Sequence, residues 1–150
     1  MCYVQYFKSQ AKKLLKDFKT QKLTFDEVLD DYLYEYQPKF FDIDEIILSY
    51  DINEKKFSLM NAQHIVAKMV GYDKWSELIN DTKEGLKFAK ALFSNNIHIE
   101  DWESYVCLNT DNEHYEDIFL DPENKLEVLK HVFLNNSNSN FDLHGYLLNK

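Results

Sequence analysis

The sequence contains no arginine, because all 17 of its basic residues are lysines. Arginine reads phosphate and guanine through paired hydrogen bonds, a geometry that lysine does not reproduce. The chain also carries 26 acidic residues and a formal net charge of −9. A negative field of this kind repels nucleic acid at long range. Together the two features count against sequence-specific DNA recognition.

Glycine, proline and cysteine are scarce, with three, two and two residues in a chain of 150. The glycines stand alone at Gly71, Gly85 and Gly145. This spacing excludes a phosphate-binding loop, a dinucleotide fingerprint and a nucleophile elbow. Cys2 and Cys107 form neither a C-x-x-C motif nor a disulfide framework. The common loop-based catalytic motifs are therefore absent.

Long apolar runs are also missing, so the sequence predicts no membrane span. The first residues lack the basic and apolar segments of a secretory signal. We therefore expect a soluble cytoplasmic protein. Its 45% hydrophobic and 15% aromatic residues suffice for one sizeable core in a domain of this length.

Apolar residues recur at helical spacing through most of the chain. Stop and start residues divide this pattern, with Ser58 and Thr82 as N-caps, Gly71 as a helix end and Asp121-Pro122 as a helix start. The predicted helices cover residues 4–18, 24–36, 59–70, 73–79, 83–94, 100–108, 113–120 and 122–134. The sequence predicts an all-α fold, a single compact domain over residues 1–150 with about seven or eight short helices.

Two parts of the helical prediction depend on local details. Thr24 and Glu27 have the spacing of a capping box, and behind them a helix over 24–36 would bury one apolar face. That face comprises Phe25, Val28, Leu29, Tyr32, Leu33 and Tyr36. Residues 40–50 fit a short helix capped by Asp42, although their β-branched and aromatic content also allows a minor strand. We prefer the helix. The tail after residue 140 is expected to pack back through Phe141, Leu143, Tyr146 and Leu147.

The segment Ser58–Ile79 contains the pattern Ala67-x-x-x-Gly71-x-x-x-Trp75-x-x-Leu78. Together with the lysine-rich first helix, it resembles a bacterial family of small helical domains described as glyoxalase-related. The resemblance covers residues 1–94 and leaves 95–150 as an acidic helical extension. It implies a helical fold in a bacterial or phage protein and no assigned chemistry. The His and Glu metal ligands of a true glyoxalase have no counterpart in this stretch.

Four lysines lie along the polar face of the first predicted helix, Lys8, Lys12, Lys16 and Lys19. Residues 1–22 carry a local charge of +5, whereas residues 23–54 carry −9. The lysine row could bind nucleic acid or an acidic partner. It could equally be a solvated face, or complement the acidic second helix within the molecule. We favour the latter two interpretations.

The acidic block suggests a different kind of surface. Asp30, Asp31, Tyr34 and Glu35 combine carboxylates with an outward tyrosine, a mixture suited to a charged protein interface. By periodicity about half of the neighbouring tyrosines belong to the core. A compact acidic protein with such a surface can neutralise a basic target.

Metal and acid–base chemistry find little support. The cluster Asp111–Asp117 is rich in carboxylates, but it lacks the glycine and glutamate positions of an EF-hand and has no His-x-x-x-His pair. The five histidines are scattered, with His64 expected on the surface. The sequence thus predicts no catalytic residue, no metal and no cofactor.

These observations favour a non-enzymatic, cytoplasmic protein-binding module, with the two surfaces above as candidate binding residues. A narrower alternative is an acidic inhibitor or immunity-type protein that covers a basic target. A second alternative is a nucleic-acid-associated protein that uses the lysine row. No motif supports an enzyme, although an active site without a known motif is not excluded. The sequence does not determine the oligomeric state.

Overall fold

The computed structural model describes residues 2–109, 121–134 and 145–148. Within them the chain is mostly helical, with seven α-helices, two short irregular helices and one small two-stranded sheet. The elements are α1 (Tyr3–Phe18), β1 (Lys22–Asp26), β2 (Asp31–Glu35), α2 (Ile43–Ser49), η1 (Glu54–Lys56), α3 (Leu59–Met69), α4 (Trp75–Ile79), α5 (Lys83–Ser94), α6 (Ile99–Asn109), α8 (Pro122–Leu129) and the π-helix η2 (Lys130–Leu134). The mainly helical prediction is therefore confirmed in part.

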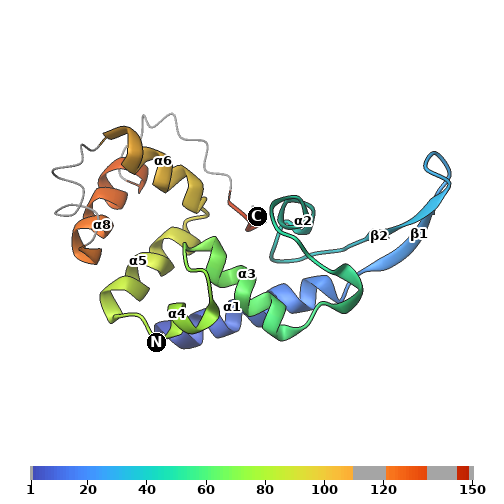
Figure 1. The fold of residues 1–150 in the computed structure, drawn as a ribbon, viewed down its shortest axis with the longest axis horizontal. Coiled ribbons are helices and arrows are strands. Elements are labelled where there is room, and N and C mark those ends of the chain that lie inside the picture. Colours follow the sequence, from blue (N-terminus) through green and yellow to red (C-terminus); the bar gives the residue numbers. More distant parts are fainter. Residues whose placement is uncertain (1, 110–120, 135–144, 149–150) are drawn as a thin grey trace.

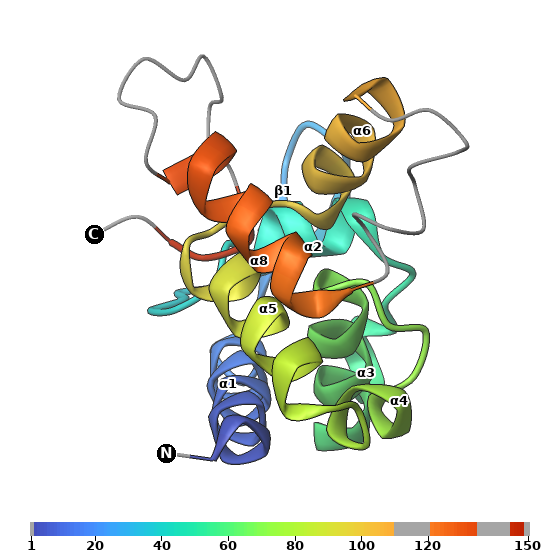
Figure 2. The ribbon, with the colours of Figure 1, turned by 90° about the vertical axis from the view of Figure 1, so that its left-hand side faces the viewer.

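The helices form a body in which α1 packs against α3 and α5, and α5 packs against α8 (Figure 2). The predicted apolar face of α1 is confirmed, since Phe7, Ala11 and Leu14 have no exposed surface. Their partners in the core include Phe41 and Leu92, which are also fully buried. One contiguous core holds the body together.

The predicted helix ends are largely confirmed because the caps work as expected. The Ser58 hydroxyl accepts a hydrogen bond from the Asn61 N–H, and the Asn61 Oδ1 accepts one from the Ser58 N–H. Thr82 Oγ1 accepts from the Gly85 N–H at 3.1 Å, and Asp121 Oδ1 accepts from the Glu123 N–H at 3.0 Å. Each side chain satisfies a backbone donor that the first helical turn leaves without a partner.

Residues 40–50 contain helix α2 rather than a strand. Asp42 Oδ1 accepts a hydrogen bond from the Glu45 N–H at 3.2 Å and caps the helix. The only extended pairing here is an isolated bridge between Phe41 and Leu147, so the alternative of a minor strand near 40–50 is wrong beyond that bridge. The tail prediction is confirmed for Tyr146 and Leu147, whereas Phe141, Leu143 and the predicted helix 113–120 lie outside the described residues.

The helix predicted over residues 24–36 is wrong, because the segment forms the antiparallel hairpin β1–β2. Asp26 Oδ1 accepts hydrogen bonds from the Val28 and Leu29 N–H groups at 2.8 and 3.1 Å, which folds the chain into a turn. Asp30 completes the turn at a φ of +52°, and Asp is one of the few residues that enter this region readily. The Thr24 hydroxyl donates across the strands to the Leu33 carbonyl instead of capping a helix.

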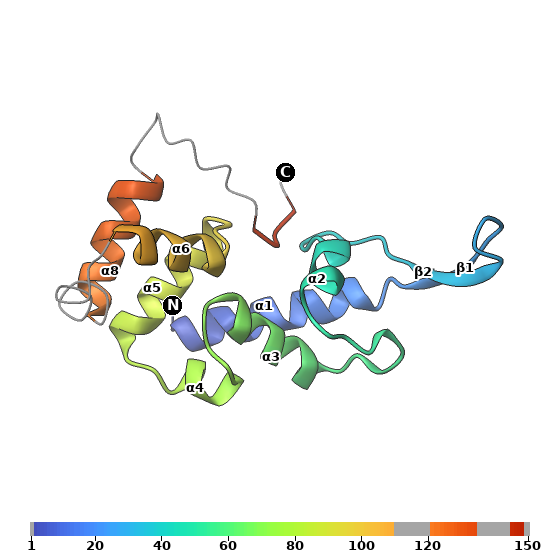
Figure 3. The ribbon, with the colours of Figure 1, turned by 45° about the horizontal axis from the view of Figure 1, so that its top comes forward.

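The hairpin extends away from the helical body, at the end opposite α8 (Figures 1 and 3). None of the described helices combines the length and the apolar content that crossing a bilayer requires. The molecule is elongated because the hairpin β1–β2 projects from the packed helical body (Figure 1).

Candidate functional site

The hairpin formed by residues 22–35, here called the hairpin arm, exposes an unusual amount of apolar side chain. Six of its large hydrophobic residues are 41–92% exposed, namely Leu23, Phe25, Val28, Leu29, Tyr32 and Leu33. Soluble monomers commonly expose single hydrophobic residues, whereas several exposed large hydrophobic residues on one small element are typical of a binding surface. All of them except Leu23 were predicted to form the buried face of a helix, and that prediction is wrong.

Strand register gives the hairpin arm two different faces. Leu23 lies opposite Tyr34 and Phe25 opposite Tyr32, so these four side chains share one face. The rings of Phe25 and Tyr32 meet edge to face with centroids 5.2 Å apart. The other face pairs Lys22 with Glu35, Thr24 with Leu33 and Asp26 with Asp31. One face is thus apolar and aromatic, and the other mostly polar.

The tip of the hairpin arm carries its most exposed side chain. Val28 is 92% exposed and Leu29 is 62% exposed. The Asp26 carboxylate holds both backbone N–H groups, as described above, which orders the turn that presents these side chains. The tip therefore offers two aliphatic groups on a defined turn.

The base of the hairpin arm is fixed to the body by a buried carboxylate that no sequence pattern singled out. Asp17 is only 2% exposed and accepts hydrogen bonds from the N–H groups of Lys39, Phe40 and Phe41 at 2.8–2.9 Å. Thr20 Oγ1 accepts from the Gln37 N–H at 2.9 Å. The end of α1 thereby fixes the chain that leaves β2.

An aromatic cluster completes this base. The Phe18 ring stacks on Phe57 with centroids 3.8 Å apart and meets Tyr36 edge to face at 5.4 Å. The Tyr36 hydroxyl donates to Glu54 Oε1 at 2.7 Å. Burial, reinforced by this hydrogen bond, raises the pKa of Tyr36 above its ordinary value of 10.0. The hairpin arm is anchored at one end and open to solvent at the other.

The hairpin arm is also strongly acidic. It contains five carboxylates and one lysine, a net charge of −4 over fourteen residues. The carboxylates are Asp26, Glu27, Asp30, Asp31 and Glu35. Asp26, Asp31 and Glu35 belong to the polar face, and Glu27 and Asp30 lie in the turn. The hairpin arm is therefore apolar on one face and negative on the other face and at the tip.

All four predicted acidic-surface residues lie on the hairpin arm. Asp30 is in the turn, and Asp31, Tyr34 and Glu35 are in β2. The three carboxylates are exposed, while Tyr34 is half-buried against its cross-strand neighbours rather than fully outward. These residues were predicted on a helix, and the structure places them on a hairpin instead. Their role in binding stays a prediction.

The four predicted lysines, Lys8, Lys12, Lys16 and Lys19, are all exposed along α1. The acidic segment extends beyond the end of α1 instead of packing along it (Figure 3). The lysines of α1 therefore do not face an acidic second helix, as one interpretation of the sequence had predicted. The row remains a solvated face next to an acidic arm.

The other residues that the sequence analysis considered for metal or acid–base chemistry are scattered in the structure. They contain no group of three or more His, Cys, Asp or Glu side chains placed to hold a metal ion. The carboxylate cluster Asp111–Asp117 lies outside this part of the chain. His64 is half-buried, and its Nδ1 accepts from the Trp75 N–H at 3.5 Å. Cys2 and Cys107 are exposed free thiols.

No family model matches the sequence, and neither a search of curated proteins nor a search of solved structures finds a match. The resemblance to the glyoxalase-related helical domains therefore stays a prediction. The function must be argued from the geometry of this molecule alone.

Proposed function

We propose that this chain is a non-enzymatic protein-binding module, and that the hairpin arm is its binding element. The observation that carries the proposal is the exposure of six large hydrophobic side chains on one ordered, projecting hairpin. A two-stranded hairpin is at best marginally stable alone, and it gains stability when one face is packed. The apolar face of the hairpin arm lacks that packing and is free to receive it from a partner.

The partner that fits is a protein with an apolar patch for one face of the hairpin arm and basic residues close to its tip and polar face. Covering a half-exposed Leu or Phe side chain contributes about 1 kcal/mol. Interface centres commonly use such apolar and aromatic anchors. The surrounding carboxylates would steer a basic partner and disfavour an acidic one. The inhibitor or immunity-type function is the special case in which this basic surface is the partner's working site.

The test uses three immobilised proteins: the wild type, an arm variant with Phe25→Ser and Val28→Ser, and a control with Leu48→Ser. Leu48 is 83% exposed on α2, so the control removes an equally exposed hydrophobic residue from the body. We expect a protein from nuclease-treated host lysate to bind the wild type and the control. The arm variant should bind it at least about tenfold more weakly.

A further variant with two substitutions tests the contribution of charge. Asp30→Lys with Asp31→Lys should slow association with the same partner, and the effect should shrink at high salt because these charges are exposed. Equal binding by the arm variant and the wild type would overturn the proposal. Retention that nuclease treatment abolishes would instead favour nucleic-acid binding through Lys8, Lys12, Lys16 and Lys19.

A further inference from the structure

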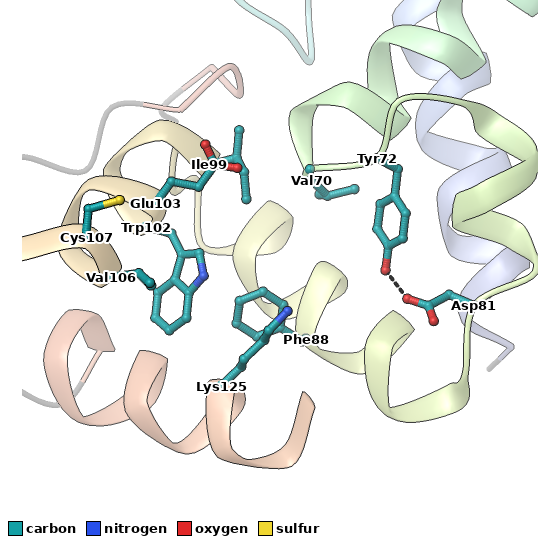
Figure 4. Close-up of a pocket in the computed structure, with 11 residues that line it drawn as sticks. Val70, Tyr72, Asp81, Phe88, Ile99, Trp102, Glu103, Val106, Cys107 and Lys125 are labelled. Atoms are coloured by element: carbon teal, nitrogen blue, oxygen red, sulfur yellow. Dashed lines mark hydrogen bonds between the residues drawn. The ribbon is translucent and has the colours of Figure 1, made fainter. Parts of the chain in front are cut away.

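A second feature lies at the opposite end of the molecule from the hairpin arm. A cavity of about 440 Å³ is enclosed by the α3–α4 loop, α5, α6 and α8 (Figure 4). Ligand pockets in proteins commonly begin at about 300 Å³, so this space suits a small molecule. The exposed side chains of Glu103 and Cys107 belong to its lining, which leaves the cavity open to solvent on that side.

The cavity contains a lysine without an ionic partner. Lys125 reaches into it from α8, and its Nζ lies 5.5 Å from the centroid of the Phe88 ring. The ammonium makes no hydrogen bond or ion pair with any residue that the structure describes. Burial lowers the pKa of this amine below 10.5, and the charge of Asp81 opposes that effect. A half-buried cation in this setting is stabilised by an anion that enters the cavity.

The opposite wall holds a fixed carboxylate. The Asp81 side chain accepts hydrogen bonds from the Tyr72 hydroxyl and, at 2.7 Å, from the Thr82 N–H. It also rests on Gly85, where any Cβ atom would collide with the carboxylate. Two hydrogen bonds leave a carboxylate with further acceptor positions. Asp81 is therefore held in place and retains capacity to accept a donor from a ligand.

Aromatic and aliphatic side chains line the cavity next to Lys125, with Trp102 and Val106 on the side of Lys125 away from Asp81 (Figure 4). Phe88 and Trp102 lie with ring centroids 5.1 Å apart, and Val106 lines the same wall. A flat ring fits against such a surface. Because Asp81 and Glu103 outnumber Lys125, the site disfavours a multiply charged anion such as a polyphosphate.

We propose that this cavity binds a small aromatic zwitterion, with its carboxylate at Lys125, its ammonium at Asp81 and its ring against Phe88 and Trp102. A free aromatic amino acid has this chemistry. The proposal does not depend on the hairpin arm, which lies at the other end of the molecule.

The test compares three probes that share one ring, L-phenylalanine, 2-phenylethylamine and 3-phenylpropionate, by calorimetry and thermal shift on the full chain. The second probe lacks the carboxylate and the third lacks the amine. We expect L-phenylalanine to bind at least about tenfold more tightly than either analogue, because each analogue leaves one charged side chain unpaired. The arm variant Phe25→Ser with Val28→Ser should bind all three probes as the wild type does.

Variants assign the two charges. Lys125→Met should lower the affinity for L-phenylalanine to that of 2-phenylethylamine, while the exposed control Lys130→Met leaves it unchanged. Removing an unpaired amine should not unfold the protein, and an unchanged melting temperature without ligand verifies this. Asp81→Asn should remove the preference over 3-phenylpropionate. Equal affinity for the three probes, the absence of saturable binding at millimolar concentration, or wild-type binding by Lys125→Met would each overturn the proposal.

Discussion

The helical body and the hairpin arm use the same kinds of side chain in opposite ways. Phe7 and Leu14 in α1 are completely buried, whereas Phe25 and Leu29 in the arm are 51% and 62% exposed. Both segments are rich in apolar residues and both are fully ordered by hydrogen bonds. The difference lies in what covers them, because α1 packs against α3 and α5 while the arm extends past its neighbours. Apolar content alone therefore does not identify the core of this protein.

The boundary between the two regions lies at Asp17. Its carboxylate holds three consecutive backbone N–H groups at the point where the chain returns from the arm to the body. We expect the residues of the helical body to contribute to folding and the residues of the hairpin arm to contribute to binding. The following predictions test that division, beginning with the largest expected effect.

Asp17→Ala should destabilise the protein by about 3–5 kcal/mol, because three backbone donors, that of Phe41 fully buried, lose their acceptor at once. Denaturation by urea, followed by circular dichroism, measures this loss. The matched control is Asp31→Ala in the arm, which should change stability by less than about 0.5 kcal/mol because Asp31 is exposed. Similar losses for both variants would place the boundary elsewhere.

Leu14→Ala should cost about 2–4 kcal/mol, since it leaves a cavity in a fully buried site. The same substitution at Leu29 should cost less than about 0.5 kcal/mol. The two variants remove identical atoms, so their difference reports only the burial of each site. Urea midpoints with an unchanged slope provide the comparison, and a large loss at Leu29 would show that the arm packs on something in the folded chain.

Gly71→Ala should cost about 1–2 kcal/mol, because Gly71 has a φ of +93° that L-residues rarely adopt. The added Cβ would also approach Ile99 Cδ1 to 3.1 Å. In the arm, Asp30 is a residue other than glycine that has a positive φ, +52°. Asp30→Gly should therefore leave the stability unchanged or raise it slightly. Melting temperatures of the two variants should therefore move in different directions.

The smallest effect concerns pH. Burial and the Asp81 carboxylate raise the pKa of Tyr72 above its ordinary value of 10.0. The folded state then keeps a proton that the unfolded state loses, so stability decreases as the pH rises above 10. Tyr72→Phe removes this contribution, and its stability should approach that of the wild type with increasing pH. A difference in stability between the two proteins that stays constant above pH 10 would contradict this role of Tyr72. The control Leu29→Ser should show the same pH dependence as the wild type.

The sequence was a good guide wherever local chemistry decides the structure. Ser58, Thr82 and Asp121 cap helices as expected, and Gly71 ends α3, because caps depend on a few neighbouring residues. Residues 24–36 misled because their apolar spacing fits a helix as well as a hairpin. The decisive feature is the Asp26 turn, which competes locally with the helix.

The candidate sites were harder to predict. Asp30, Asp31, Tyr34 and Glu35 stood out by composition, yet the apolar half of the arm was assigned to the core. Only tertiary structure shows that no helix covers Phe25 or Val28. Asp17 looked like one acid in a lysine-rich helix, and the Lys125 cavity joins residues more than 40 positions apart in the sequence. The spacing of apolar residues along the sequence does not show which distant side chains come together in the fold.

The central claim is that the hairpin arm serves binding rather than folding. Lys22 and Glu35 lie opposite each other, so residues 23–34 can be replaced by a short Gly-Ser turn without pulling the body apart. Differential scanning calorimetry of this shortened chain is the most direct test. We predict a melting temperature within about 3 °C of the wild type and an equally cooperative transition. A loss of about 10 °C or more would show that the arm is part of the folding unit, and the account would be wrong.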